Sequence, residues 1–254
     1  MIFYTRTLRQ IPIAISKYRV ETLRGLAESS LGAGGLAAVG GAMMVVAFLV
    51  INGGAVVGII GHAQLGNIGL EALGGFFSAY GNTRLPAPTI AIVGLSATVG
   101  AGATAQIGAM RINEEVDALE VMGISSIAYL ASTRVVAGLI AVVPIFFSAL
   151  LGAYVASRFV LVDVYGQSGG VYDHYFDTFL NPTDVVWATV QVAGGGVAVM
   201  LIHTYYGLTA SGGPAGVGAA TGRAVRTSMV VAVFLVLAMS LVLYGRSGNF
   251  HLSA

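Results

Sequence analysis

Long apolar stretches separated by short charged segments dominate this chain. Asp, Glu, Lys and Arg are missing from five of them, at residues 29–70, 85–110, 135–157, 185–222 and 227–245. A membrane-spanning helix needs about 20 apolar residues. The two longest stretches exceed one span but contain no charged turn that would divide them, and their Gly-rich ends account for the surplus. We therefore expect five transmembrane helices, at about 39–60, 86–110, 128–162, 184–207 and 224–245.

The composition predicts a polytopic integral membrane protein of the all-α class. Of the 254 residues 56% are hydrophobic and 9% charged, with a mean hydropathy of +0.85, whereas a soluble protein of this size would need more polar surface. No stretch is polar and long enough to fold alone, so we expect one domain over residues 1–254. The chain has no Cys, which excludes thiolate metal sites, and its four scattered His show no ligand spacing. We expect no bound metal or cofactor, and no basic stripe indicates nucleic-acid binding.

The basic residues are distributed unevenly between the two sides that five spans create. One side carries nine of the twelve, namely Arg6, Arg9, Lys17, Arg19, Arg24, Arg111, Arg134, Arg223 and Arg226. The other side carries the acidic Glu71, Asp163, Asp173, Asp177 and Asp184. Because Lys and Arg concentrate on the cytoplasmic side, we expect the N-terminus to be cytoplasmic and the C-terminus extracytoplasmic. The membrane that we expect is the plasma (inner) membrane.

Residues 1–30 do not have the pattern of a cleaved signal peptide. Charges continue to Glu28, and the apolar stretch that follows is far longer than the core of a signal. Ile11, Ile15 and nearby apolar residues fall roughly on one helical face, and Lys17 and other charged residues cover the other. This pattern predicts an interfacial helix on the cytoplasmic leaflet. A disordered basic tail is the alternative.

An acidic segment at residues 111–124 separates the second and third spans. It holds four of the eleven acidic residues, and carboxylates are too costly to bury in hydrocarbon. We expect a surface helix at 112–124. Its apolar stripe consists of Ile112, Val116, Leu119 and Met122. Such a helix can insert its apolar face into a groove of a soluble partner; a solvated helix without a partner is the alternative.

Two further patterns suggest chemistry. Ser96 and His203 lie in different spans and resemble the Ser/His dyad of rhomboid proteases, so an intramembrane serine hydrolase is an alternative function. A nucleophilic serine needs a base within hydrogen-bond reach, and the stripe of small residues around Ser96 also explains it by packing. The Gly-rich segment 212–218 lacks the Lys and Ser/Thr of a phosphate-binding loop. It is better interpreted as a structured turn.

Two long motifs resemble those of the MlaE/YrbE permeases. The segment Ile112-Asn-Glu-Glu-Val-Asp-Ala-Leu-Glu-Val-Met-Gly-Ile124 is similar to their coupling-helix pattern E-Q-I-D-A-L-x-x-M-G. The segment 207–225, GLTASGGPAGVGAATGRAV, is similar to their pattern G-L-x-x-x-G-G-P-x-G-V-G-x-A-T-x-x-A-V. The resemblance implies an MlaE-like permease fold and a permease subunit of an ATP-driven, Mce-type (actinobacterial) ABC transporter. Such transporters move hydrophobic lipids of the fatty acid, mycolate, sterol or phospholipid class across the cell envelope.

The resemblance also implies the partners. They are a second YrbE-type permease subunit, a cytoplasmic ABC ATPase dimer that binds ATP and Mg²⁺, and MCE-domain proteins on the outer side. This chain would then be no enzyme itself; a passive scaffold for an MCE assembly is a further alternative. The expected ATPase-coupling residues are Glu114, Glu115, Asp117, Ala118, Leu119, Glu120, Met122 and Gly123. The family usually has Gln at Glu115 and Arg at Thr98, and these departures favour a heterodimer.

Lipid tails need an apolar path, which we expect at the seam between permease subunits. The first span offers Met43, Met44, Phe48, Leu49 and Asn52 roughly on one face, and the last span offers Phe234, Leu237 and Leu241. Methionine side chains adapt to varied shapes, which suits acyl chains. Core packing or ordinary lipid contact explains these residues equally well.

Overall fold

The computed structural model describes residues 2–31 and 36–244, with side chains from 3–25 and 46–244. All regular structure in these residues is helical. Five helical segments are long and apolar enough to cross a membrane: Val46–Gly66, Glu71–Ile112, Ile127–Val164, Pro182–Leu208 and Gly213–Tyr244. The predicted all-α class with five spans is thereby confirmed.

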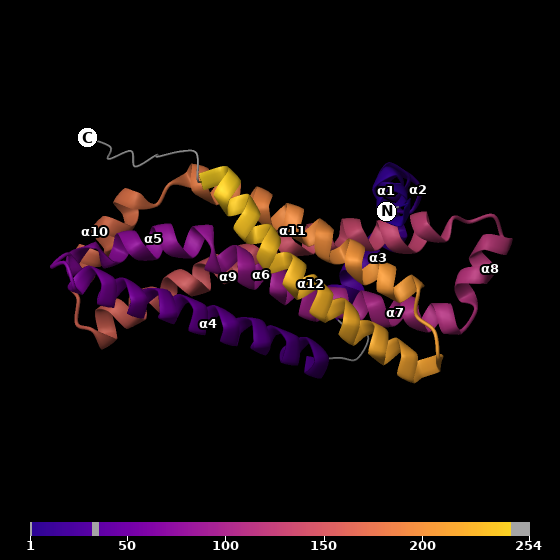
Figure 1. Cartoon of the computed structure of the whole chain (residues 1–254), viewed down its shortest axis with the longest axis horizontal. Helices are drawn as coiled ribbons and strands as arrows, with labels where there is room; N and C mark the ends of the chain where they lie inside the picture. Colours follow the sequence, from indigo (N-terminus) through magenta and orange to yellow (C-terminus); the bar gives the residue numbers. More distant parts are fainter. Residues whose placement is uncertain (1, 32–35, 245–254) are drawn as a thin grey trace. The chain divides into compact units, whose positions relative to one another are not determined.

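The helices follow one another along the chain as labelled in Figure 1. Before the first span lie α1 (Ile2–Arg9), α2 (Ile11–Lys17) and α3 (Arg19–Leu31), and α4 (Leu36–Gly66) contains that span. The second span comprises the 3₁₀ helix η1 (Glu71–Leu73), α5 (Gly74–Arg84), α6 (Pro86–Leu95), the π-helical segment η2 (Ser96–Gly100) and α7 (Ala101–Ile112). After α8 (Glu115–Val121), the third span comprises the π-helical segment η3 (Ile127–Ser132), α9 (Thr133–Phe159) and the π-helical segment η4 (Val160–Val164). Then come α10 (Gly169–Phe179), α11 (Pro182–Leu208) and α12 (Gly213–Tyr244).

The chain divides into two compact units. The first unit contains Met1–Val46, Ala91–Ile145 and Ala193–Ala232, and the second contains Ala47–Ile90, Phe146–Val192 and Val233–Ala254. The boundaries fall inside α4, α6, α9, α11 and α12, so each unit holds part of every spanning segment. The first unit contains the N-terminal helices and α8, and the second contains α5 and α10.

The N-terminal segment forms three helices instead of the single one expected over residues 1–30. Helix α1 ends before Pro12, which lacks the N–H that a continuous helix needs, and Tyr18 separates α2 from α3. Within the first unit the segment packs on the start of the third span, where Ser132 Oγ donates to the Thr7 carbonyl at 2.9 Å. Ile15 and Leu23 stay exposed, which is compatible with the predicted position at a membrane surface.

The second and last spans begin earlier than the apolar stretches predicted. Helix α5 precedes Pro86, and in the second unit it packs against α10, beside it in Figure 1. The predicted second span began only after Arg84, because a charged residue marks the edge of an apolar stretch. Helix α12 begins at Gly213, so most of the Gly-rich segment is helical and the expected turn is confined to its start. Gly212 and Gly213 make that turn with φ of 88° and 69°, a conformation that favours glycine.

Candidate functional site

The acidic segment forms a short helix, α8, whose two ends are sharply defined. Glu114 has a left-handed backbone (φ 62°) and separates α8 from α7. At the other end Gly123 (φ 73°) is also left-handed, and its N–H donates to the Glu120 carbonyl while that of Ile124 donates to Leu119. This is the usual glycine-terminated end of a helix. The helix covers Glu115–Val121, which is shorter than the expected 112–124.

The apolar stripe of α8 packs on the protein itself. Val116 is 4% exposed and contacts a cluster in the first unit that contains Ile107 and Leu130, and Leu119 packs against the same cluster. Val116 is therefore buried within the chain and is not available to insert into a partner's groove, whereas Leu119 stays partly exposed. A helix this short is stable only when it buries an apolar face, and the end of the second span provides the surface.

The acidic side chains of α8 face outward. Glu115 and Asp117 are exposed, and Arg111 at the end of α7 donates a hydrogen bond to Asp117 and forms an ion pair with it. Glu120 is also exposed and accepts a hydrogen bond from Ser126 Oγ at 2.7 Å. These contacts orient two of the carboxylates and hold α8 to the ends of both neighbouring spans.

Two apolar side chains extend from the C-terminal end of α8. Val121 is 89% exposed and Met122 is 65% exposed, and the predicted residues Glu114, Ala118 and Gly123 are exposed with them. Sequence reasoning missed Val121 because it lies outside the apolar stripe. That position could itself have identified Val121, because a valine outside the buried face of a surface helix must lie in solvent or contact a partner.

The second unit contains an open groove of about 520 Å³. Helix α4, the α5–α6 junction and α12 line it, through Leu49, Asn52, Gly53, Val56, Leu85, Pro86, Thr89, Ile90, Val233, Val236 and Leu237. The two polar side chains are satisfied within their own helices, because Asn52 Nδ2 donates to the Phe48 carbonyl and Thr89 Oγ1 to the Leu85 carbonyl, each at 2.7 Å. The groove therefore presents a mainly aliphatic surface.

The groove brings together part of the predicted lipid path. Leu49, Asn52 and Leu237 line it, whereas Phe48, Phe234 and Leu241 are 66%, 70% and 73% exposed and do not. Met43 and Met44 lie outside the residues whose side chains the structure describes. Sequence reasoning missed Leu85, Pro86 and Thr89. Pro86 predicts a helix boundary because a proline disfavours helical backbone at the residue before it, and a groove can form at such a boundary.

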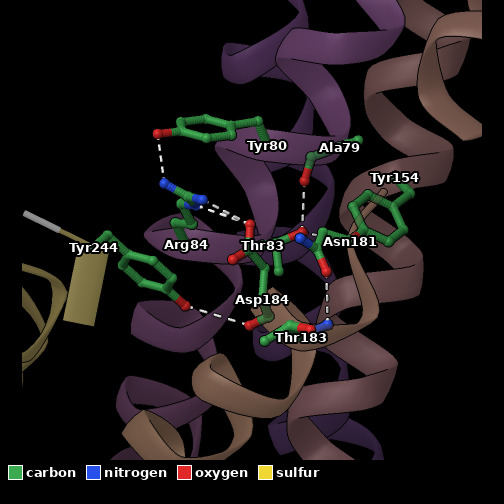
Figure 2. A network of polar contacts seen from close by, with 9 residues as sticks. All are labelled: Ala79, Tyr80, Thr83, Arg84, Tyr154, Asn181, Thr183, Asp184 and Tyr244. Carbon is green, nitrogen blue, oxygen red and sulfur yellow. Dashed lines mark hydrogen bonds and ion pairs between the residues drawn. The ribbon is translucent and has the colours of Figure 1, made fainter. Parts of the chain in front are cut away.

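A polar cluster joins three helix ends in the second unit (Figure 2). Arg84 Nε and Nη2 donate to Asp184 Oδ2 at 3.1 and 2.7 Å, and the Tyr80 hydroxyl accepts from Arg84 Nη1. The guanidinium lies 3.7 Å from the ring centroid of Tyr80 and 4.3 Å from that of Tyr244. Tyr244 also donates to the Asp184 carbonyl at 3.3 Å. We refer to Tyr80, Arg84, Asp184 and Tyr244 as the Arg84 cluster.

Ser96 and His203 do meet, inside the first unit. Ser96 Oγ lies 3.2 Å from His203 Nε2 and 2.7 Å from Ser228 Oγ, and Thr104 Oγ1 lies 2.7 Å from His203 Nδ1. All four side chains are fully buried. In this conformation neither substrate nor water reaches Ser96, and the polar atoms satisfy one another, so the arrangement explains helix packing better than hydrolysis. Among the side chains described, His, Cys, Asp and Glu form no group of three that could hold a metal.

The described geometry agrees with the family that the sequence matches. A model of the family described as "Permease MlaE" matches residues 35–242, which is most of the chain and includes nearly all of the five spanning segments. The match contains α8, the groove and the buried Ser96 cluster alike. It assigns the chain to transport and gives no support to the hydrolase alternative.

Individual relatives agree. Over 164 residues the chain is 31% identical to the chloroplastic protein TRIGALACTOSYLDIACYLGLYCEROL 1 of Arabidopsis thaliana, covering 64% of this chain and 47% of the relative. Over 155 residues it is 33% identical to a probable ABC transporter permease protein of Synechocystis sp. (60% and 58%) and 32% identical to one of Rickettsia bellii (59% and 58%). The chain thus spans about half the length of the curated relatives it matches.

Proposed function

Because the chain belongs to the MlaE permease family of ABC transporters, we propose that it is the membrane-spanning subunit of an ATP-driven lipid transporter. Members of this class are permeases and not enzymes, so a separate ATPase would bind ATP and Mg²⁺. The groove of about 520 Å³ carries the proposal. Its aliphatic lining fits an acyl chain or another apolar tail, since burying such a tail removes apolar surface from water. The Arabidopsis relative bears the name of a lipid.

The side of α8 that faces away from the protein supports an ATPase partner. Val121 and Met122 are apolar and exposed, and Glu115, Asp117 and Glu120 on the same short helix are exposed and acidic. An apolar centre with a charged rim is the usual anatomy of a protein interface. The ATPase would receive Val121 and Met122 in a shallow apolar site, with basic side chains opposite the acids. In this proposal Val121 and Met122 take the central place that the sequence expectation gave to Val116, which is buried.

The further partners and the orientation follow from the resemblance and the charge distribution. The Mce-type assignment implies a second YrbE-type permease subunit and MCE-domain proteins on the outer side of the plasma membrane. Helix α10 belongs to that outer side, because it lies in the acid-rich segment between the third and fourth spans. Its exposed Asp173 and Asp177 would face the MCE proteins.

One experiment tests the ATPase contact. Met122→Asp should abolish copurification of the ATPase with the tagged chain in mild detergent, because it places a charge at the centre of an apolar contact. Ile68→Asp is the matched control, since Ile68 is equally exposed, at 65%, but lies between the first and second spans and not in α8. If the Met122 variant retains the ATPase as fully as the control does, α8 is not the coupling element.

A second experiment tests the lipid path. Leu49→Trp adds bulk inside the groove, whereas Phe48→Trp adds it one residue away on a side chain that does not line the groove. Lipid uptake should fall in the Leu49 variant and remain normal in the Phe48 variant, at equal expression. Normal uptake in both would place the lipid path elsewhere.

The Met122 variant also tests the passive-scaffold alternative. If it loses the ATPase from the complex without any loss of lipid uptake, a passive scaffold is favoured.

A further inference from the structure

The Arg84 cluster differs from an ordinary surface ion pair. The Arg84 and Asp184 side chains are only 13% and 17% exposed, whereas those of Arg158 and Asp173, another ion pair of the second unit, are 45% and 51% exposed. Water screens an exposed pair and leaves it little net attraction, and a shielded pair keeps more. The two tyrosine rings further restrict the guanidinium plane of Arg84, adding cation–π attraction. The cluster is therefore a firm junction.

The junction holds the ends of two groove walls. Helix α5 ends at Arg84, and the next two residues, Leu85 and Pro86, line the groove. Helix α12 lines it with Val233, Val236 and Leu237 and reaches the cluster at Tyr244. Gln191 Nε2 donates to the Val236 carbonyl at 2.8 Å and so holds the middle of this wall. Its end is held by the Arg84 cluster.

The cluster lies at the edge of the apolar layer. The charge-free stretch of the fourth span begins immediately after Asp184, and that of the fifth span ends just beyond Tyr244. Because Arg84 contacts both residues, it lies at the same level, and Leu85–Ile90 lie deeper. A lipid that enters the groove from this edge therefore passes close to the cluster before it reaches Leu85–Ile90.

We propose that Arg84 is a positioning residue that sets the width of this end of the groove and thereby selects slender, unbranched lipid tails over bulky ring systems. The inference rests on the proposed function, in which the groove accepts lipid. Arg84 acts through Asp184 and Tyr244 and need not touch the lipid itself. Neutralising either member of the ion pair loosens the guanidinium that packs on the Tyr244 ring, so that the end of α12 is held less tightly and the entrance widens.

The test measures tail selectivity. Photoreactive palmitic acid and photoreactive cholesterol are offered in phosphatidylcholine vesicles to the full-length chain with its copurifying subunits, and labelled groove peptides are quantified by mass spectrometry. Arg84→Gln and Asp184→Asn should each raise the sterol-to-fatty-acid labelling ratio, on the order of fivefold. The double variant should give no further rise, because the same interaction is lost. Arg158→Gln is the matched control and should leave the ratio unchanged.

The outcomes distinguish this proposal from the proposed function on which it rests. Wild-type labelling of the groove with a ratio unchanged in Arg84→Gln overturns the role of Arg84 alone. No labelling of groove peptides by either probe in the unaltered protein overturns both. Should Arg84→Gln fail to assemble, Tyr244→Phe replaces it, because that change removes only the hydroxyl contact to Asp184 and keeps the ring. A smaller rise in the same direction is then expected, and an unchanged ratio refutes the proposal.

Discussion

Replacement of Gly100 by Ala tests how tightly the buried cluster around His203 is packed. A Cβ atom on Gly100 would lie 2.7 Å from both Cδ2 and Nε2 of His203. Ordinary van der Waals contact needs roughly 3.5 Å, so the imidazole must move by about 0.8 Å. The ring is not free to do so, because Ser96 and Ser228 hold Nε2 and Thr104 holds Nδ1.

The magnitude follows from these contacts. Overpacking a closely fitted core costs about 1–3 kcal/mol, and losing one buried hydrogen bond costs about 1–3 kcal/mol more. Alanine returns up to about 1 kcal/mol through its higher helix propensity. We therefore expect Gly100→Ala to lower the free energy of unfolding by about 1–5 kcal/mol. Gly102 lies two residues away, and a Cβ atom added there would have nothing within 4 Å, so Gly102→Ala should be neutral or slightly stabilising.

The assay is reversible unfolding of both variants in mixed micelles, followed by circular dichroism. A difference between Gly100→Ala and Gly102→Ala of less than about 0.5 kcal/mol, the usual range of surface substitutions, would refute the reasoning. A double variant that also carries His203→Ala gives a second check. Its loss should be smaller than the sum of the two single losses, because His203 is the side chain against which the new methyl collides.

Three further predictions concern α5 and α10 of the second unit and the orientation of the chain. Gly75→Ala should destabilise the protein, because its Cβ would overlap the Tyr172 carbonyl and lie 2.7 Å from the Phe176 nitrogen, while Gly170→Ala in α10 should be tolerated; thermal unfolding compares them. Burial raises the pKa of Tyr172 to about 12. Its contribution to stability is therefore complete below its ordinary pKa of about 10 and lost as the pH rises through about 12, which absorbance titration against Tyr172→Phe should show. A cysteine replacing Ser168 should react with an impermeant thiol reagent in intact cells stripped of outer barriers, and one replacing Asn113 only after lysis; the reverse result would overturn the orientation.

The spans could be predicted from sequence because the underlying energy is large. A charged side chain in hydrocarbon costs several kcal/mol, so charges mark the limits of apolar helices even in a single sequence. The same rule explains why α5 was not predicted. The apolar stretch begins just after Arg84, whereas α5 lies on the N-terminal side of that boundary. Whether a charge ends a helix or only the apolar layer is decided by tertiary partners, here Asp184 and the two tyrosines.

The candidate sites were only partly accessible from sequence. Helical periodicity correctly grouped Val116 with Leu119 on one side of α8, but amphipathicity does not say whether that side meets the same chain or another one. Here that side meets Ile107 and Leu130 of the same chain, which lie outside α8 and so outside its periodic pattern. In the groove, Leu49 and Leu237 followed from the face of a helix. Leu85 and Thr89 did not, because a helix break places them and not a period.

The π-helical segments η2, η3 and η4 have a consequence for how related chains are compared. A π-helical turn accommodates one residue more than an α-helical turn of the same span, so the faces on either side of it are out of step by one position. Each of these segments lies within the second or third span. A single periodic frame fitted across Ser96–Gly100 must therefore fail. A homologue that lacks one residue there would form a regular α-helix with the same faces. A one-residue gap in the alignment would then mean that the π-helical turn is absent, not that the function is lost.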